Sequence, residues 1–369
     1  MRILLVMPSW VGDACMVTPA LRIIRRACPG ALIGGLMRPG IDEVLAGTTF
    51  LDEWHIARAS GVMGPKFAAA KVRPRRYDIA CLFTNSFSTA LTARIAGIPR
   101  RIGFDRDVRG LLLTDPIDEP TDASIQSKRV PIAAVDWYHT LAFRLLEVVK
   151  GDKPGTASRS LVPLPTGELV ELGTTAEGDE LAQNILQRAG VETGSGYAIL
   201  NPGGNNEAKR WPAERFVLVA RHLRERYGLT VLVNGSPNEA ALCDHISTES
   251  GAGCVALPAL GGTIASLKSL VKHAAVMVTN DTGPRYFALG FGTPCVALYG
   301  PTDVRWTQTP VPPGVAHEVI VANPDLPKHL VADDHPKECA ITRIGIAHVI
   351  EATDRVLALS QHLRRVVTH

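Results

Sequence analysis

Short apolar runs alternate with longer amphipathic stretches along the first half of the chain. The apolar runs predict strands at Arg2–Pro8, Ala31–Met37, Glu53–Ala57, Tyr77–Thr84 and Arg100–Phe104. Between them, apolar residues recur at helical spacing over Ala14–Ala27 and over Phe87–Ala96. Strands that alternate with helices in this way are typical of a parallel α/β sheet.

The second half of the chain shows the same alternation. Strands are predicted at Tyr197–Leu200, Thr230–Val233, Ala275–Thr279 and Pro294–Tyr299. Helices are predicted at Ala176–Ala189, Ala213–Tyr227, Glu239–Thr248, Ile264–His273, Gly283–Gly290 and Ile346–Val366. The stretch Gly151–Gly196 begins with a segment rich in Gly, Pro and Ser, which favours a linker between two domains.

A chain of 369 residues is too long for one ordinary core. We therefore expect two facing Rossmann-like domains with a cleft between them, over residues 1–172 and 173–345. The helix over 346–369 is expected to pack back onto the first domain. Ligands of open α/β sheets bind at the carboxyl ends of the strands, so these ends should line the cleft.

Composition narrows the class of protein. A hydrophobic content of 46% with 20% charged residues is typical of a soluble globular chain. The apolar run Ile3–Met7 is too short for a signal peptide, and no apolar run approaches the roughly 20 residues that span a bilayer. The seven cysteines are scattered without CxxC spacing. They predict reduced thiols in a cytoplasmic protein rather than disulfides or a zinc site.

The net charge of +3 conceals an asymmetry between the two halves. Residues 1–110 contain 16 Lys and Arg against 8 Asp and Glu, whereas the remainder contains 23 against 28. Excess arginine in the first part indicates an anionic partner there: a phosphorylated substrate, an anionic membrane surface or nucleic acid. No nucleic-acid-binding module is recognisable, so we expect no nucleic-acid partner.

Three junctions between a predicted strand and a predicted helix carry residues suited to chemistry. The first is SWVGD, residues 9–13, where Asp13 is suited either to cap the helix or to act as a general base. The second is NPGGNNEAKRWP, residues 201–212, where two glycines let backbone amides approach an anion and Lys209 supplies a charge. The third is NDTG, residues 280–283, where free backbone N–H groups at a helix start suit a diphosphate.

Taken together, the three motifs resemble those of the lipopolysaccharide heptosyltransferases, the ADP-heptose family of GT-B glycosyltransferases, and most closely their heptosyltransferase II branch. The resemblance covers nearly the whole chain. It includes the start RILLVMPSWVGDACMVTPALR, the middle RRIGFDRDVRGLLLTD, the segment LGGTIASLKSLVKHA and the tail ECAITRIGIAHVIEATDRVL.

The resemblance implies an inverting transfer of heptose from ADP-heptose to a sugar hydroxyl of the lipopolysaccharide inner core, without an essential metal or other cofactor. It implies that Asp13 is the base and that Lys209 neutralises the departing diphosphate. The expected donor-binding residues are Gly203, Gly204, Asn205, Lys209, Glu239, Asp281, Thr282, Gly283 and Tyr286, with Glu239 on the adenosine ribose. The phosphorylated glycolipid acceptor is expected to contact Arg73, Arg76, Arg101, Arg106 and Arg109, and Arg75 and Arg100 are further candidates.

Two departures from the family pattern lie where the donor binds. Many members have histidine where this chain has Tyr286, and some have paired threonines where it has Gly203 and Gly204. A GT-B transferase with another nucleotide-sugar donor, or a non-catalytic sugar-nucleotide or glycolipid-binding homologue, is therefore an alternative. The motif Asp105-Arg106-Asp107 looks like a metal-binding DxD, but it lies in the acceptor-side region, so no metal site is predicted. A peripheral contact at the inner face of the cytoplasmic membrane would fit a glycolipid acceptor.

Overall fold

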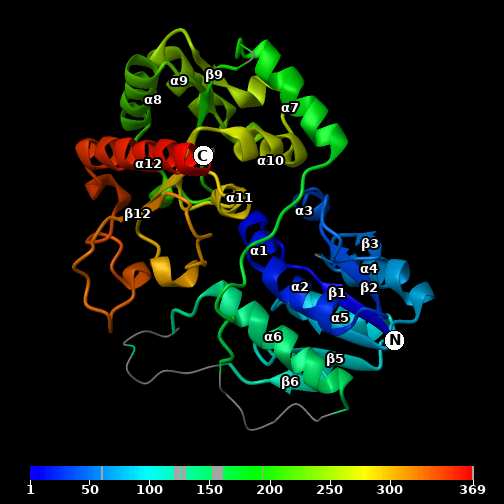
Figure 1. The fold of residues 1–369 in the computed structure, drawn as a ribbon. Helices are drawn as coiled ribbons and strands as arrows, with labels where there is room; N and C mark the ends of the chain where they lie inside the picture. The colour runs from blue at the N-terminus through cyan, green and yellow to red at the C-terminus, as the bar shows by residue number, and fades with distance from the viewer. Residues whose placement is uncertain (60, 120–124, 126–129, 152–160, 193, 368–369) are drawn as a thin grey trace. The chain divides into compact units, whose positions relative to one another are not determined.

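The computed structural model divides the chain into two compact units, each of which is described by itself (Figure 1). The first unit comprises Met1–Ala123, Val130–Gly173 and Arg305–Pro310, and the second comprises Ser124–Arg129, Thr174–Val304 and Val311–His369. The structure describes residues 1–369 except 60, 120–124, 126–129, 152–160, 193 and 368–369. Part of the expected linker therefore lies outside the described residues.

A six-stranded parallel sheet with the order β3-β2-β1-β4-β5-β6 forms the centre of the first unit. Its strands are β1 (Arg2–Val6), β2 (Leu32–Met37), β3 (Glu53–Ile56), β4 (Ile79–Leu82), β5 (Arg100–Phe104) and β6 (Asp115–Ile117). The strand β1 is buried from Ile3 to Val6, as expected for a sheet covered on both faces.

Helices cover both faces of this sheet. They are α1 (Val11–Met16), α2 (Thr18–Ala27), α3 (Ile41–Leu45), α4 (Gly64–Val72), α5 (Phe87–Ile95) and α6 (Ala134–Val149). The helices α1, α2, α3 and α6 contact one another on one face, whereas α4 packs against α5 on the other. One predicted helix, Ala14–Ala27, is thus two, and Pro19 stands in the first turn of the second.

The second unit repeats the architecture. Its six-stranded parallel sheet has the order β12-β11-β10-β7-β8-β9. The strands are β7 (Tyr197–Asn201), β8 (Thr230–Val233), β9 (Cys254–Ala256), β10 (Val276–Asn280), β11 (Cys295–Tyr299) and β12 (His317–Val321). The helices are α7 (Ala176–Arg188), α8 (Ala213–Tyr227), α9 (Ala240–Ser250), α10 (Ile264–His273), α11 (Arg285–Phe291) and α12 (Ile346–Val367).

The C-terminal helix does not pack where the sequence analysis expected it. The described part of α12 contacts α8 and the strands β10, β11 and β12 of the second unit. Its apolar residues Val349, Ala352 and Val356 are fully buried in the core of that unit, together with Phe216 of α8. The expectation that this helix returns to the first domain is therefore corrected, because its apolar face is already covered by the second sheet.

Candidate functional site

In each unit, the strand order of the sheet indicates where a ligand would bind, and the position is equivalent in the two sheets. In each sheet the order of the strands reverses between two central neighbours, β1 and β4 in the first unit and β7 and β10 in the second. Ligands of open α/β sheets bind at the carboxyl ends of the strands at such a switch point. The loops that follow these four strands carry SWVGD, the segment Phe83–Ser86, PGGNN and DTG.

In the second unit, the switch point brings Lys209 and Asp281 together. The ammonium Nζ of Lys209 donates a hydrogen bond to Oδ2 of Asp281 at 3.1 Å. The Asp281 side chain is only 5% exposed, whereas that of Lys209 is 23% exposed. The carboxylate thus fixes a cation whose outer side remains open to a ligand, which suits electrostatic stabilisation of an anion.

The DTG segment is a loop rather than the first turn of a helix, because α11 begins only at Arg285. Within the described residues, no protein acceptor is recorded for the backbone N–H groups of Thr282 and Gly283. Successive free N–H groups of this kind form an anion-binding concavity. The loop and Lys209 together therefore offer one ammonium and two amide donors.

A chain of buried amides holds this loop in place. The amide Nδ2 of Asn201, at the end of β7, donates to Thr282 Oγ1 at 2.6 Å and to Thr279 Oγ1 at 3.0 Å. The Nδ2 group of Asn234, just after β8, donates to Oδ1 of Asn201 at 2.6 Å. The Nδ2 group of Asn280 donates to the carbonyl of Pro202 at 2.7 Å, so the loops after β7 and β10 are joined directly.

The carboxylate of Glu239 supports the glycine loop. Its Oε1 accepts the N–H of Gly204 at 2.7 Å, while its Oε2 accepts both the N–H and the hydroxyl of Ser236 at 2.8 Å. These bonds from Ser236 and Gly204, with the nearby Arg210, hold the pKa of Glu239 below its usual value although burial opposes this. A Cβ on Gly203 would lie 2.4 Å from Oε1 of Glu239, so a larger residue there would displace this carboxylate from its hydrogen bonds. Asn205, next in the loop, is exposed.

Tyr286, expected at the donor, does not present its side chain to solvent. It is only 2% exposed, and the guanidinium of Arg285 lies 4.4 Å from its ring centroid. Arg285 also lies 5.2 Å from the ring of Tyr299. Burial alone would lower the pKa of Arg285, but Tyr286, Tyr299 and Asp281 together raise it, so it stays charged. We revise the donor set accordingly, since Tyr286 packs inside the unit.

In the first unit, Asp13 stands at the switch point and does not cap a helix. The N-cap of α1 is Trp10, and Asp13 lies in the first turn. Its Oδ1 accepts a hydrogen bond from the hydroxyl of Tyr138 on α6 at 2.7 Å. The ring of Tyr138 packs edge-to-face against Phe83, with centroids 5.9 Å apart. The half-buried carboxylate is thus held by a neighbour that sequence reasoning missed.

The arginines expected at the acceptor fall into two groups. Arg109 is 0% exposed and donates to the carbonyls of Phe104 and Thr84 and to Oδ1 of Asn85. Arg101 is 9% exposed and donates to the carbonyls of Leu112 and Ile98. The guanidinium of Arg109 holds the carboxyl edge of the first sheet, and that of Arg101 holds the loops that precede β5 and β6. Because both are buried, they leave the acceptor set.

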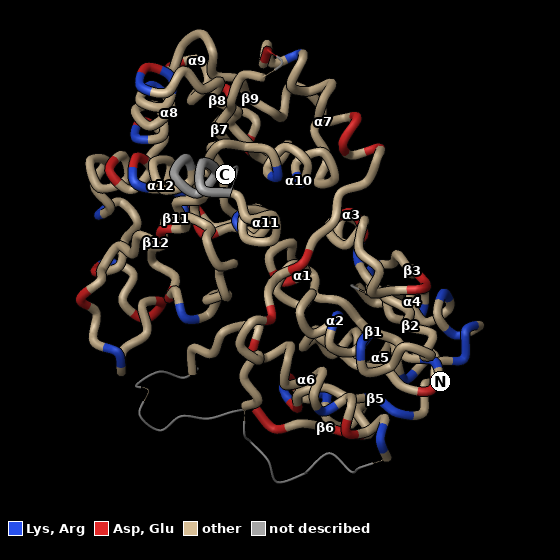
Figure 2. Tube along the Cα trace, in the orientation of Figure 1, with Lys and Arg blue, Asp and Glu red and all other residues tan. Residues whose placement is uncertain are grey.

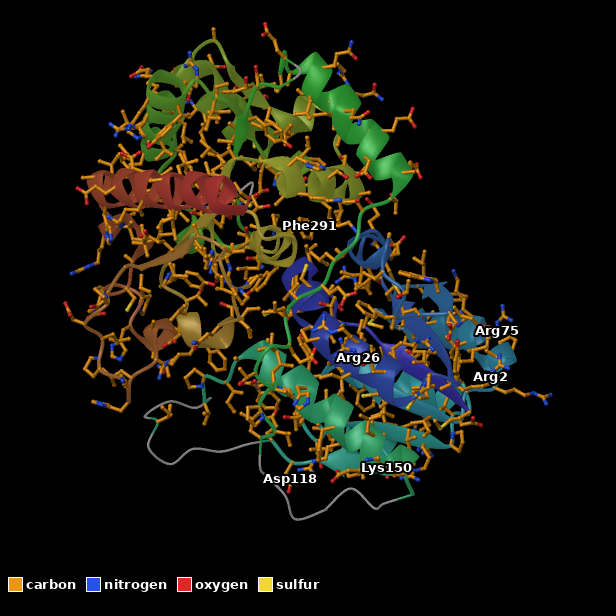
Figure 3. All side chains as sticks on the ribbon, in the orientation of Figure 1. Arg2, Arg26, Arg75, Asp118, Lys150 and Phe291 are labelled. Atoms are coloured by element: carbon orange, nitrogen blue, oxygen red, sulfur yellow. The ribbon has the colours of Figure 1, made fainter. Side chains whose placement is uncertain are left out.

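The remaining acceptor candidates lie nearer the surface. Arg73 and Arg76 are exposed, and Arg106 is half-buried and pairs with Glu119 at 2.9 Å. Figure 3 labels Arg2 and Arg75 close to each other. Both approach Glu53, at 3.7 and 3.5 Å. Arg100 is held by Asp115 at 2.6 Å. Arg73, Arg76 and Arg106 thus stay predictions.

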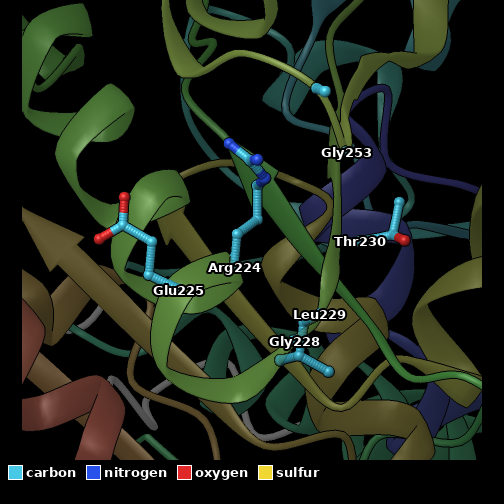
Figure 4. A pocket seen from close by; sticks show the side chains of 7 residues that line it. Arg224, Glu225, Gly228, Leu229, Thr230 and Gly253 are labelled. Atoms are coloured by element: carbon cyan, nitrogen blue, oxygen red, sulfur yellow. The ribbon is translucent and has the colours of Figure 1, made fainter.

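One hollow in the second unit lies away from these loops (Figure 4). It has a volume of about 300 Å³ and is lined by Arg224 and Glu225 of α8 and by residues at the amino ends of β8 and β9. The guanidinium of Arg224 donates to the carbonyl of Ser250 at 2.5 Å. This hollow has no group aimed into it that could serve the chemistry of the switch point.

Two features are absent from the described residues. No group of three or more His, Cys, Asp or Glu side chains is gathered as metal ligands would be. No helix in the described part of the chain combines the length and the hydropathy that a membrane span needs.

Comparison with known proteins decides the family. The family model of glycosyltransferase family 9 (heptosyltransferase) matches residues 68–333. The chain belongs to glycosyltransferase family 9. It is thus a glycosyltransferase, and the resemblance inferred from SWVGD, the AKRWP segment and DTG is confirmed.

One sequence match and one structural match, both from Escherichia coli, extend this assignment. The lipopolysaccharide heptosyltransferase 2 of strain K12 is 27% identical over 317 residues, which is 83% of this chain and 85% of that protein. The structure of the E. coli ADP-heptose lps heptosyltransferase II has a TM-score of 0.75 at 23% identity and covers 98% of this chain and 100% of that one. The α/β fold of GT-B type is therefore confirmed.

A second similar structure contains a nucleotide. The E. coli heptosyltransferase WaaC with ADP has a TM-score of 0.62 at 17% identity and covers 98% of this chain and 99% of that one. At this identity the likeness shows the fold alone, and what WaaC binds is a property of that protein.

Proposed function

We propose that the protein transfers heptose from ADP-heptose to a sugar hydroxyl of the lipopolysaccharide inner core, with inversion at the anomeric carbon. The names of its relatives, lipopolysaccharide heptosyltransferase 2 among them, support the donor and the acceptor. The observation that carries the proposal is the cationic switch point of the second unit. There Lys209 is held 3.1 Å from Asp281 beside the N–H groups of Thr282 and Gly283.

These groups suit a departing diphosphate. As the bond between the anomeric carbon and the diphosphate oxygen breaks, its electron pair moves to that oxygen and the negative charge on ADP grows. A fixed ammonium group and two aimed amides bind this growing charge better than they bind the intact donor, which lowers the barrier. Asp281 holds Lys209 in place before the donor arrives, so little reorganisation is needed.

Asp13 takes the role of the base. The acceptor hydroxyl attacks the anomeric carbon from the side opposite the diphosphate, and its proton passes to the carboxylate. The hydrogen bond from the hydroxyl of Tyr138 to Oδ1 orients this carboxylate. Productive transfer requires Asp13 and Lys209 to act on the same bound donor. No step of this scheme uses a metal ion.

Other calls depend on the acceptor and stay proposals. The acceptor is an anionic glycolipid, so we propose that the protein works in the cytoplasm in peripheral contact with the inner face of the membrane. The residues Arg73, Arg76 and Arg106 contact acceptor phosphates, while Gly203, Gly204, Asn205 and Glu239 bind the donor, with Glu239 on the ribose. The first domain, over 1–172, binds the acceptor and the second, over 173–345, binds the donor.

A second candidate is a GT-B transferase that uses another nucleotide sugar. It is favoured by the loop Gly203-Gly204-Asn205 and by the buried Tyr286, which depart from the family pattern at the donor. A non-catalytic homologue is disfavoured because Asp13 and Lys209 are both present.

A calorimetric screen of the full chain against ADP-heptose, ADP-glucose, UDP-, GDP- and CDP-sugars separates these functions. We expect ADP-heptose to bind most tightly, and the chain to release ADP when a heptose-accepting inner-core oligosaccharide is added. Tighter binding of a UDP- or GDP-sugar would overturn the proposed donor. Tight binding of ADP-heptose with no release of ADP would favour the non-catalytic homologue.

A further inference from the structure

The segment Ala57–Arg76 of the first unit has an unusual charge. It contains six basic residues and no acidic residue. The basic residues are Arg58, Lys66, Lys71, Arg73, Arg75 and Arg76. The segment comprises the loop before α4, the helix itself and the short turn that follows it, and Figure 2 shows Lys and Arg gathered around α4.

Apolar side chains are exposed on the same segment. Val62 is 98% exposed, Met63 46% and Phe67 65%. On α4 the residues Ala68, Ala69 and Val72 are buried in the core, whereas Lys66, Phe67, Ala70 and Lys71 face solvent. Residues three and four apart share a face of a helix, so Met63, Phe67 and Lys71 form one exposed stripe with Lys66 and Ala70 beside it. We call this surface, Val62–Lys71 with Arg58, the α4 face.

The charge of the α4 face is largely uncompensated. Among the residues that the structure describes, Arg58 and Lys66 have no acidic partner. Lys71 donates to the carbonyl of Ile56 at 2.7 Å, which orders the side chain but leaves its charge. Within the described residues, Arg75 is the one basic residue of the segment that forms an ion pair, and its partner is Glu53.

We infer that the α4 face docks on the surface of an anionic lipid bilayer. Basic residues near such a surface are attracted to its negative potential, and exposed apolar side chains between them enter the boundary between headgroups and acyl chains. Two of the three exposed apolar members, Val62 and Met63, have no ring to stack on bases and gain nothing from phosphates, which favours a lipid surface over nucleic acid.

This inference rests on the proposed function and deepens it, because a lipid-linked acceptor would bring the enzyme to a membrane. The contacts that support it are independent of the donor chemistry. None of Arg58, Val62, Lys66 or Phe67 belongs to the switch points or to the proposed acceptor set. Their substitution should therefore leave transfer to a soluble acceptor unchanged.

The test is co-sedimentation of the full chain with two kinds of vesicle, phosphatidylcholine alone and phosphatidylcholine with phosphatidylglycerol. We expect binding to the anionic vesicles only, and weaker binding as salt is raised. The double variant Arg58→Gln, Lys66→Gln should bind about 30-fold more weakly, since each basic charge near an anionic surface contributes about fivefold. Phe67→Ser should weaken binding about tenfold, because it removes the largest side chain that enters the interface.

Matched controls come from the second unit. Leu218→Ser on α8 removes an apolar side chain that is 45% exposed, and Lys337→Gln removes an exposed charge. Both should bind the anionic vesicles as the unchanged protein does. An equal loss in these controls, or equal binding to both kinds of vesicle, would overturn the inference. The inference would also be overturned if the unchanged protein bound a single-stranded oligonucleotide and no vesicle, and if the α4 variants lost that oligonucleotide binding.

The same variants separate this inference from the proposed function. Each is assayed for transfer to a water-soluble inner-core oligosaccharide, and its thermal unfolding midpoint is recorded. Normal transfer and normal midpoints with lost vesicle binding support the α4 face. If the unchanged protein has no transferase activity but binds vesicles through Lys66 and Phe67, the proposed function is wrong and the inference about the α4 face is still supported.

Discussion

The two units share one topology but differ at their switch points. In the second unit, buried amides of Asn201, Asn234 and Asn280 connect the loops after three strands into one hydrogen-bonded network. In the first unit, the corresponding place has one half-buried carboxylate, Asp13, held by the hydroxyl of Tyr138. A sheet of the same order can thus have either a hydrogen-bonded network of amides or a single held carboxylate at its switch point, according to its loops. The proposed roles of donor cradle and proton acceptor follow this difference.

The surfaces of the two units differ as well. Among the described residues, the exposed large apolar side chains number eleven in the first unit and four in the second. The first unit also has the basic segment Ala57–Arg76. These differences fit a division of labour in which the second unit binds a small, soluble, anionic donor and the first unit meets a large amphiphilic acceptor.

In the second unit, a large effect that would break this comparison is expected at Lys209. Lys209→Met should lower kcat about 10²–10³-fold, because it removes a fixed charge that stabilises the leaving group. The neighbouring Asp281 would also lose its partner at 3.1 Å. Steady-state kinetics with ADP-heptose measures the loss. Lys272→Met, at an exposed position in the last turn of α10, is the matched control and should stay near full activity. Equal kinetics of the two variants would remove Lys209 from the site.

A smaller effect is expected at Tyr138, whose hydroxyl holds Asp13. Tyr138→Phe removes the hydrogen bond of 2.7 Å to Asp13 and should lower kcat about tenfold, the value of one hydrogen bond to a charged group. The KM for the donor should not change if the donor binds the other unit, as we propose. Tyr227→Phe is a close control, since its hydroxyl donates to Asp354 at 2.8 Å far along the chain from either switch point. A rise in donor KM with unchanged kcat would contradict this role for Tyr138.

A third effect concerns stability in acid. Burial, with help from Arg285, lowers the pKa of His317 on β12 to about 4. The unfolded chain therefore binds a proton at His317 near pH 6.5, whereas the folded unit keeps this histidine neutral down to about pH 4. The contribution of His317 to the free energy of unfolding is thus complete above about pH 6.5 and is lost as the pH falls toward about 4. The loss should reach about 2–3 kcal/mol near pH 4.5.

The free energy of unfolding of the second unit, measured with urea at pH values from about 6.5 to 4, checks this prediction. His317→Leu should flatten the dependence on pH, whereas His348→Leu, at an exposed position on α12, should not. A slope that is the same in all three chains would show that His317 contributes nothing to it.

Much of the architecture could be predicted because apolar periodicity was strong. The strands β5 and β8 and the helices α8 and α10 have the predicted bounds. The short edge strands β6, β9 and β12 were missed, since three to five half-buried residues give little periodicity. The helix α6 was missed too, although its residue Tyr138 holds Asp13.

The residues of the candidate site that stand in recognisable motifs could be predicted from the sequence, but the contacts between distant residues could not. Lys209 and Asp281 were named from separate motifs, and their contact follows from the neighbouring positions of β7 and β10. The roles of Asn201 and Tyr138 were beyond prediction, because each acts through a partner 81 or 125 residues away in the chain. Burial also could not be read from charge, which is why Arg101 and Arg109 were wrongly expected to reach the acceptor.

The central claim is that one carboxylate of the first unit accepts the proton while the second unit binds the donor. The most direct test is to measure, for Asp13→Asn, both the Kd for ADP-heptose and the rate of transfer, with Asp42→Asn on α3 as the matched control. We predict an unchanged Kd and a rate lower by about 10²–10⁴-fold in Asp13→Asn, with neither changed in the control. Transfer at nearly the normal rate by Asp13→Asn would contradict the account.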